Sequence, residues 1–393
     1  MNRVLSGLEV FLENPPAWIS GQRIGLLCNP ASIDINFQHA RYRLHDRFPN
    51  QLKALFFPQH GLFSEKQDNM IESEDSLDPL LGIPAFSLYG KTRKPSKRMF
   101  DRIDVLVVDL QDVGTRVYTF TSTLSYCMQA AKRFNKKVLV LDRPNPIGGL
   151  KIEGNCLAPD CRSFVGRYPI PMRHGLTMAE YAGMINTQFE IACELTCVPM
   201  ANWKRQMIFE DTGLPWVAPS PNLPTPSSAA VYPGQVVWEG TQVSEGRGTS
   251  LPFEIVGAPY VLPHKILAYL DGQALPGVTL REVAFEPTAN KWQGDLCRGF
   301  QLHITDSSAY QPYETSLRLL QAVMAVHAES FAWKQPPYEY EFERRPIDLI
   351  IGDTDIVRRL ENLDDPASIF RSWQPLLDQY RSMCQHYYLY ANE

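Results

Sequence analysis

The chain has 393 residues, of which 44% are hydrophobic and 21% charged, a composition typical of folded proteins and not of disordered ones. Its 38 basic and 43 acidic residues give a net charge of −5, which disfavours nucleic acid as a partner. The apolar runs last only a few residues, whereas a bilayer needs about 20, so we expect no membrane span. The N-terminus lacks the apolar stretch of a secretory signal, which favours a cytoplasmic location.

Short apolar runs alternate with stretches of helical period through the first half of the chain, as in parallel βαβ units. The predicted strands cover residues 23–29, 52–58, 85–89, 105–109, 137–142 and 194–200. The predicted helices cover residues 35–48, 97–103, 120–134 and 177–189. We therefore expect an α/β fold with a Rossmann-like, doubly wound and mostly parallel sheet.

A proline-rich crossing separates this region from the rest of the chain, because residues 211–226 contain five prolines and interleaved aromatic and aliphatic side chains. The predicted domains are residues 1–225 and a second, smaller α+β domain at 226–393. In the second domain we expect strands at residues 235–239, 283–286 and 299–304, and helices at 313–327 and 375–384.

Polar side chains follow the carboxyl ends of four predicted strands, where ligands bind in doubly wound sheets. These residues are Asn29, Gln59, His60, Asp109, Gln111, Asp112, Arg143 and Asn145. The chain has no G-x-G-x-x-G after its first strand and no P-loop, which disfavours a nucleotide, and we expect no cofactor. It also lacks the G-x-S-x-G and H-E-x-x-H motifs of serine hydrolases and zinc proteases.

The densest polar segment covers residues 238–249, where Glu239 and Glu245 flank a glycine-rich turn and Arg247 follows. Glycosidic cleavage uses two carboxyl groups that lie about 5–9.5 Å apart, one of which donates a proton to the leaving oxygen. A turn that folds back could bring Glu239 and Glu245 to this separation. The alternative is a solvated loop in which Glu245 and Arg247 merely pair.

Further candidate acids lie elsewhere in the chain. His60 and Glu65 follow a predicted strand, and Glu153 follows a Pro/Gly turn; the alternatives are a structural histidine and a turn salt bridge.

The segment that contains Asp109, Gln111, Asp112 and Arg116 could bind sugar hydroxyls or a metal. Five aromatic residues near these motifs could stack on a sugar ring or simply fill the core, namely Tyr118, Tyr168, Trp203, Trp216 and Trp238.

Ordered motifs over nearly the whole chain resemble those of the exo-β-N-acetylmuramidase family NamZ, long known as DUF1343. They include Pro58-Gln-His-Gly61, Asp109-Leu-Gln-Asp-Val-Gly114, Leu141-Asp-Arg-Pro-Asn-Pro-Ile147, Tyr168-Pro-Ile-Pro-Met-Arg-His-Gly175 and Ser244-Glu-Gly-Arg-Gly-Thr249. The resemblance implies an active-site cleft between the two domains. It also implies hydrolytic release of non-reducing-end N-acetylmuramic acid from peptidoglycan fragments, in cell-wall recycling or scavenging.

One departure from the family pattern concerns Gln59, because many relatives carry Pro-Glu-His-Gly where this chain has Pro-Gln-His-Gly. The muramic residue also carries a lactyl carboxylate, for which a cation is expected. The candidates within matched motifs are Arg116, Arg143, Arg173 and Arg247, of which Arg247 is favoured.

The leading hypothesis is a glycoside hydrolase that acts on a muramic-acid-containing glycan or muropeptide. Its candidate catalytic residues are Glu65, Glu239 and Glu245. Its candidate substrate-binding residues are His60, Asp109, Gln111, Arg116, Asn145, Glu153, Asn222 and Arg247. The alternatives are a non-catalytic muropeptide-binding protein, in which Gln59 marks lost chemistry, and a metal-dependent hydrolase built on His60, Asp109 and Asp112.

Overall fold

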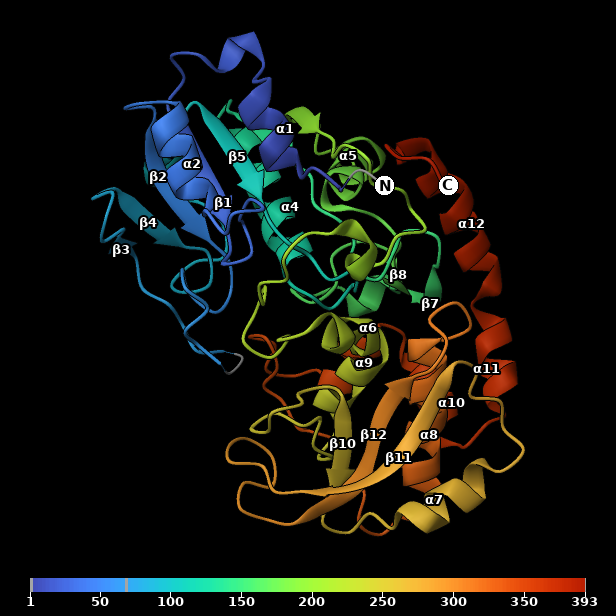
Figure 1. The fold of residues 1–393 in the computed structure, drawn as a ribbon. Helices are drawn as coiled ribbons and strands as arrows, with labels where there is room; N and C mark the ends of the chain where they lie inside the picture. Colours follow the sequence, from blue (N-terminus) through green and yellow to red (C-terminus); the bar gives the residue numbers. More distant parts are fainter. Residues whose placement is uncertain (1–2, 68–69, 393) are drawn as a thin grey trace.

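Seven strands form the sheet of the N-terminal lobe in the order β3-β4-β2-β1-β5-β6-β9 (Figure 1). The computed structural model describes residues 3–67 and 70–392. The strands are β1 (Ile24–Cys28), β2 (Leu52–Phe57), β3 (Ser76–Leu77), β4 (Pro84–Ser87), β5 (Val105–Asp109), β6 (Lys137–Leu141) and β9 (Glu194–Val198). All neighbours pair in parallel except β3 and β4, so the predicted doubly wound sheet and its six predicted strands are confirmed.

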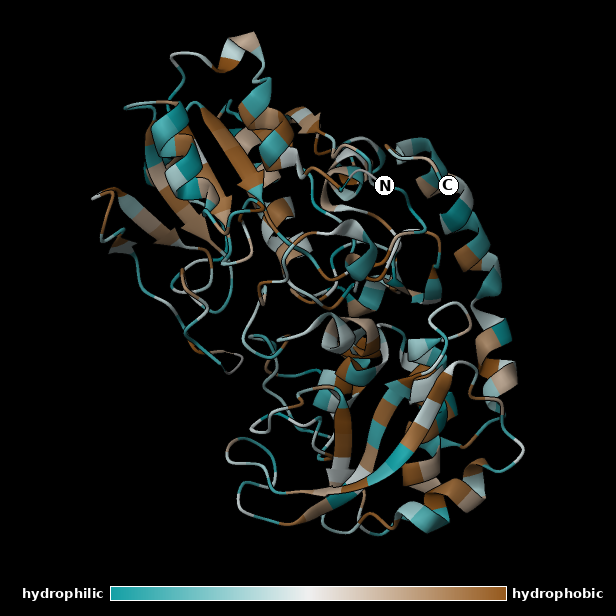
Figure 2. Ribbon diagram, in the orientation of Figure 1, coloured by the Kyte–Doolittle hydropathy of each residue, from teal (hydrophilic) through white to brown (hydrophobic). Residues whose placement is uncertain are grey.

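Helices cover both faces of this sheet, and the strands alternate between two apolar clusters with the period of two that strands have. Val105 and Val107 pack in the cluster with α1 (Gly7–Glu13) and α2 (Ala40–Arg47). Leu106 and Val108 pack in the cluster with α4 (Phe120–Arg133) and α5 (Met178–Gln188). Figure 2 shows the resulting apolar strands between helices with mixed surfaces.

Two predicted helix boundaries differ from the structure. The helix predicted from residue 35 begins at Ala40, because Ile33 and His39 form a β-bridge and the His39 side chain caps the first turn. The helix α3 (Lys97–Phe100) is shorter than predicted. The predicted start of α5 is confirmed, since Thr177 and Glu180 form a capping box.

The C-terminal lobe contains a three-stranded antiparallel sheet in the order β10-β12-β11, with helices packed against it. Its strands are β10 (Ile255–Ala258), β11 (Val278–Phe285) and β12 (Cys297–Ile304). Its helices are α6 (Pro226–Gln235), α7 (Pro263–Leu270), α8 (Pro312–Val326), α9 (Pro346–Ile351) and α10 (Thr354–Glu361). The predicted mixed α+β character of this region is confirmed.

The strand predicted at residues 235–239 is wrong. The helix α6 extends to Gln235, and the 3-10 helix η4 (Val236–Gly240) follows it directly. Val236, Val237 and Trp238 are fully buried, and a short apolar run that is buried on all sides looks the same in a sequence whether it is strand or helix. Glu239 therefore projects from a tight helical turn and not from a strand end.

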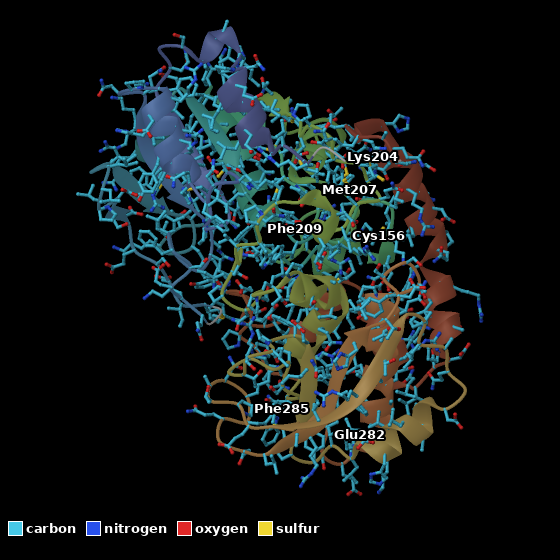
Figure 3. The ribbon with its side chains drawn as sticks, in the orientation of Figure 1. Cys156, Lys204, Met207, Phe209, Glu282 and Phe285 are labelled. Carbon is cyan, nitrogen blue, oxygen red and sulfur yellow. The ribbon has the colours of Figure 1, made fainter. Side chains whose placement is uncertain are left out.

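Buried contacts join the two lobes. The Arg116 guanidinium donates to the carbonyls of Asn155 and Ile170 in the N-terminal lobe and of Ile350 and Ile351 in α9. The hairpin of β7 (Glu153–Cys156) and β8 (Pro171–Arg173) lies at this boundary, where side chains fill the space around Cys156 (Figure 3).

The last helices, α11 (Pro366–Ser372) and α12 (Gln374–Cys384), run back along the C-terminal lobe to the N-terminal one (Figure 1). The Tyr390 hydroxyl donates to Asp142 there at 2.5 Å. Within the part of the chain that the structure describes, every helix falls short of the length and apolar character that a membrane crossing needs.

Candidate active site

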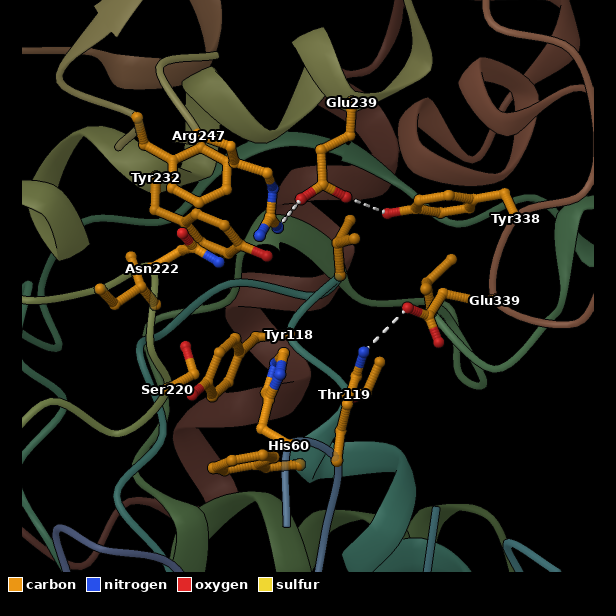
Figure 4. A pocket seen from close by; sticks show the side chains of 16 residues that line it. His60, Tyr118, Thr119, Ser220, Asn222, Tyr232, Glu239, Arg247, Tyr338 and Glu339 are labelled. Atoms are coloured by element: carbon orange, nitrogen blue, oxygen red, sulfur yellow. Dashed lines mark hydrogen bonds and ion pairs between the residues drawn. The ribbon is translucent and has the colours of Figure 1, made fainter. Parts of the chain in front are cut away.

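A cavity that is partly open to solvent lies between residues of both lobes (Figure 4). The loop after β2 and the start of α4 form its N-terminal wall. The proline-rich crossing, α6, η4 and the loop between α8 and α9 form the rest. The polar residues that line it are Gln59, His60, Tyr118, Thr119, Ser220, Asn222, Tyr232, Glu239, Arg247, Tyr338 and Glu339.

Glu239 is a buried carboxylate that is ion-paired across this cavity wall. Its Oε1 accepts from Arg247 Nη2 at 2.5 Å, and its Oε2 accepts from the Tyr338 hydroxyl at 2.6 Å (Figure 4). The Arg247 pKa is raised, because the carboxylates of Glu239 and Glu245 outweigh the opposing effect of burial. Glu239 is thus held at the cavity wall by one cation and one hydroxyl group.

Glu339 is a second buried carboxyl in the same cavity, but neutral groups hold it. Its Oε1 accepts from the Gln59 amide at 3.0 Å, and its Oε2 accepts from the Tyr89 hydroxyl at 2.6 Å. Burial raises the pKa of Glu339 to about 7, and the nearby Glu239 carboxylate adds to the rise. A carboxylic acid with this pKa keeps its proton in a substantial fraction of molecules near neutral pH.

The backbone at Glu339 is held in an uncommon conformation. Glu339 and Tyr340 have φ angles of 49° and 64°, and Tyr338 and Glu341 exchange two backbone hydrogen bonds of 2.9 Å around them. Positive φ at both central residues is typical of a type I′ turn, where Asn-Gly is preferred to larger side chains. Such costly conformations concentrate at functional sites, and this one aims Glu339 into the cavity.

The residues after β2 complete the wall beside Glu339. The Thr119 hydroxyl donates to Gln59 Oε1 at 2.8 Å, which fixes the Gln59 amide with its N–H toward Glu339. His60, at a φ of 80°, donates from Nδ1 to the Lys66 carbonyl at 2.7 Å. Gln59 is therefore a direct partner of Glu339.

Glu245 lies behind Arg247 and outside the cavity lining. Its carboxylate binds Arg247 Nε at 3.0 Å and Lys291 Nζ at 2.7 Å. Although burial opposes ionisation, these two cations lower the Glu245 pKa. The glycine-rich turn does bring Glu239 and Glu245 together, but they meet around a shared guanidinium group.

Of the predicted site residues, His60, Asn222, Glu239 and Arg247 line the cavity together. Glu65 does not, since its side chain is exposed and accepts from the backbone N–H of Phe63.

The other predicted residues make internal contacts that hold the fold. Asp109 forms a two-point ion pair with Arg143, and Gln111 donates to the carbonyls of Asp112 and Pro144. Arg116 binds the four carbonyls described above. Asn145 donates to Leu176, and Glu153 accepts from the first N–H groups of α8.

The aromatic candidates separate in the same way. Tyr118 lines the cavity, whereas Trp203 and Trp238 are buried in apolar clusters and Trp216 packs edge-on against Phe209. Tyr168 faces a neighbouring groove. Across residues 3–67 and 70–392, no three His, Cys, Asp or Glu side chains form a group that could hold a metal, so Asp109, Asp112 and His60 do not converge.

Glu339 is not among the predicted acids, and Gln59 is predicted only as one of the polar residues at the strand ends. Glu339 belongs to the run Tyr338-Glu-Tyr-Glu-Phe-Glu343 after two prolines. Alternating aromatic and acidic side chains of this kind can serve sugar binding, and this is the signal that could have drawn attention to it.

A two-lobed α/β protein with two buried carboxyl groups in one cavity has the pair of acidic side chains that a carboxylate-based glycosidase uses. The model for "Exo-beta-N-acetylmuramidase NamZ, N-terminal" matches residues 24–227, and that for "Exo-beta-N-acetylmuramidase NamZ, C-terminal" matches residues 230–390. The chain belongs to the exo-β-N-acetylmuramidase NamZ family.

Individual relatives agree with this assignment. The peptidoglycan beta-N-acetylmuramidase NamZ of Bacillus subtilis (strain 168) is 40% identical over 388 residues, which cover 99% of this chain and 92% of that one. A DUF1343 family protein from Bacteroides fragilis NCTC 9343 has a TM-score of 0.89 at 35% identity, with 99% of both chains covered. A second DUF1343 protein from that organism has a TM-score of 0.77 at 27% identity, with 100% of both chains covered.

Proposed function

We propose that this protein is an exo-β-N-acetylmuramidase, a glycoside hydrolase that releases N-acetylmuramic acid from the non-reducing end of peptidoglycan fragments. The family assignment supports the reaction. The single observation that carries the chemistry is that Glu239 and Glu339 line one cavity in different electrostatic environments. This division separates an ion-paired carboxylate from an acid that can keep its proton.

Glu339 is the proton donor in this proposal. Its raised pKa of about 7 allows it to protonate the glycosidic oxygen, which then leaves as a hydroxyl group on the next sugar. Tyr89 and Gln59 orient the carboxyl group without neutralising it, since both donate from uncharged groups. A positioned acid of this kind contributes about 10²–10⁴-fold to a rate.

Glu239 supplies the second carboxylate, which stabilises the positive charge that develops at the sugar ring or attacks directly or through water. Its hydrogen bonds from Arg247 and Tyr338 fix its position. His60 and Asn222 line the same cavity and bind the sugar, and Arg247 is the arginine of the lining that faces the lactyl carboxylate.

A non-catalytic muropeptide-binding protein is the second candidate, and the observation that favours it is that Glu339 has the amide of Gln59 as its neighbour, a group that has no acidic proton. The two functions separate in one experiment. Purified protein is incubated with the disaccharide N-acetylmuramyl-β-1,4-N-acetylglucosamine, and free N-acetylmuramic acid is measured by mass spectrometry. Release of the monosaccharide supports the hydrolase, whereas binding of the disaccharide without release supports the binding protein.

A further inference from the structure

A groove of about 1000 Å³ adjoins the cavity, and Glu339 lines both. Four arginines face this groove, Arg93, Arg162, Arg167 and Arg344, and we call it the arginine groove. Aromatic rings form much of the remaining wall. A positively charged groove is notable in a chain whose net charge is −5, because the positive charge is concentrated at one place beside the candidate acid.

Neutral groups hold two of these arginines in place. The Arg93 guanidinium lies 4.8 Å from the Phe164 ring centroid and 4.7 Å from that of Tyr340, and donates to the Glu339 carbonyl. The Arg167 guanidinium lies 3.8 Å from the Tyr126 centroid and donates to the Ser125 hydroxyl. Aromatic stacking of this kind fixes a guanidinium group and preserves its charge.

The other two arginines lie together at the groove. Arg344 is paired with Glu341 and donates to the carbonyls of Asp160 and Arg162, whose own side chain is exposed. Among the residues that the structure describes, the pair of Arg344 with Glu341 is the one ion pair that any of the four arginines forms. Four guanidinium groups and one Glu341 carboxylate leave an excess of three positive charges whenever Glu339 is protonated.

We propose that the arginine groove binds a carboxylate of the glycan on the leaving-group side of the bond that is cut. The inference rests on the proposed hydrolase. A proton donor must touch the oxygen between the cleaved sugar and the leaving sugar, so the two spaces that meet at Glu339 hold the two sides of the substrate. The leaving N-acetylglucosamine is uncharged, so it offers no carboxylate that the four arginines could bind.

The next muramic residue along the glycan carries a lactyl carboxylate, and peptides attached to that group carry more. Guanidinium groups recognise carboxylates through paired, charge-assisted hydrogen bonds. The aromatic rings that hold Arg93 and Arg167 also offer apolar faces to sugar rings. The arginine groove therefore selects glycans that are long enough to bring a second carboxylate past the leaving sugar.

The test compares two peptide-free trisaccharides of equal length. Both begin with N-acetylmuramic acid and continue with N-acetylglucosamine; the third unit is N-acetylmuramic acid in one and N-acetylglucosamine in the other. We expect kcat/KM of the wild-type protein to be about tenfold or more higher for the trisaccharide with the second carboxylate. In the double variant Arg162→Gln/Arg167→Gln this ratio falls to near one, while in the control Arg371→Gln, an exposed arginine outside the groove, it is retained.

A third substrate, the anionic trisaccharide with a peptide on its last residue, separates the two sources of carboxylate. If the wild-type protein prefers the anionic trisaccharide within the peptide-free pair, the groove binds the lactyl carboxylate. If a preference appears only with the peptide-bearing substrate, the groove binds the peptide carboxylates. Equal kcat/KM for all three substrates overturns the groove proposal even if the disaccharide is hydrolysed. If no substrate is hydrolysed, the proposed hydrolase function is wrong. The groove proposal is then tested by the dissociation constants of the two peptide-free trisaccharides, and a ratio of these constants near one overturns it.

Discussion

Two buried carboxyl groups, Asp109 at the end of β5 and Glu339 at the lobe boundary, differ in what holds them. Asp109 receives two hydrogen bonds from the Arg143 guanidinium and is fully buried. Glu339 receives its hydrogen bonds from the uncharged Gln59 and Tyr89. The arginine ties Asp109 into the fold, whereas burial raises the pKa of Glu339, whose carboxyl oxygens accept from uncharged donors, so that Glu339 can keep a proton and give it away.

The same distinction applies inside the candidate site. Glu245 lies between two cations, Arg247 and Lys291, outside the cavity lining, while Glu239 shares Arg247 and reaches the cavity. The number of cations that bind the carboxyl group therefore increases from Glu339, which uncharged groups hold, through Glu239 with one to Glu245 with two.

The largest effect is expected for Glu339→Gln. An amide keeps the shape of the side chain but has no acidic proton, so kcat/KM for the muramyl disaccharide should fall about 10²–10⁴-fold at pH 6. The matched control is Glu343→Gln in the same loop, whose side chain is exposed and should leave kcat/KM unchanged. A Glu339→Gln protein with wild-type kcat/KM would exclude Glu339 as the acid.

Asp109→Asn should act on stability instead. It leaves the Arg143 guanidinium buried without its carboxylate, which should lower the free energy of unfolding by about 3–5 kcal/mol. Urea unfolding measures the loss, and Asp101→Asn, which removes an exposed pair with Lys97, is the control with little expected effect. The comparison breaks down if Asp109→Asn is as stable as the wild type.

The pH dependence of stability should reveal the proton on Glu339. Its pKa rises from an ordinary 4.5 to about 7 on folding, so the folded form binds the proton more tightly. Below pH 4.5 both forms carry the proton, and the stabilisation is then lost as the pH rises from 4.5 through 7. Glu339→Gln removes this loss, so relative to the wild type it should gain up to about 3 kcal/mol between pH 4 and pH 8. A constant difference across this range would contradict the raised pKa.

The smallest change is expected for Gln59→Glu, which places a second carboxyl group next to Glu339. Two adjacent carboxyl groups hold one shared proton more tightly than either does alone, so the pKa of the pair rises. The fall of kcat/KM on the alkaline side should move up by about one pH unit. An unchanged pH profile would mean that residue 59 does not influence the acid.

Strong local patterns made the N-terminal lobe predictable from sequence. The strand Val105–Asp109 is apolar on both faces, and Thr177 and Glu180 mark a helix start within four residues. The strand predicted at residues 235–239 is wrong, because complete burial removes the periodicity that distinguishes a strand from a helix.

The candidate site was predictable in part for the same reason. Glu239 and Arg247 lie in one dense polar segment, and the structure places both at the cavity. Glu339 could not be found in this way, because its partner Gln59 is 280 positions away and its own neighbours resemble a solvated acidic loop. The polar residues at the strand ends were predicted to bind a ligand, but Asp109 and Arg143 pair with each other instead. Their spacing in the sequence does not reveal this contact.

The most direct test of the proton donor varies the leaving group. A 2,4-dinitrophenyl β-N-acetylmuraminide needs no protonation on departure, because dinitrophenol is far more acidic than a sugar hydroxyl and leaves as its anion. The muramyl disaccharide does need it. We predict that Glu339→Gln retains kcat/KM on the dinitrophenyl substrate within about tenfold while losing about 10²–10⁴-fold on the disaccharide. Equal losses on both substrates would contradict the account, since they would show that Glu339 supports the structure of the site and donates no proton.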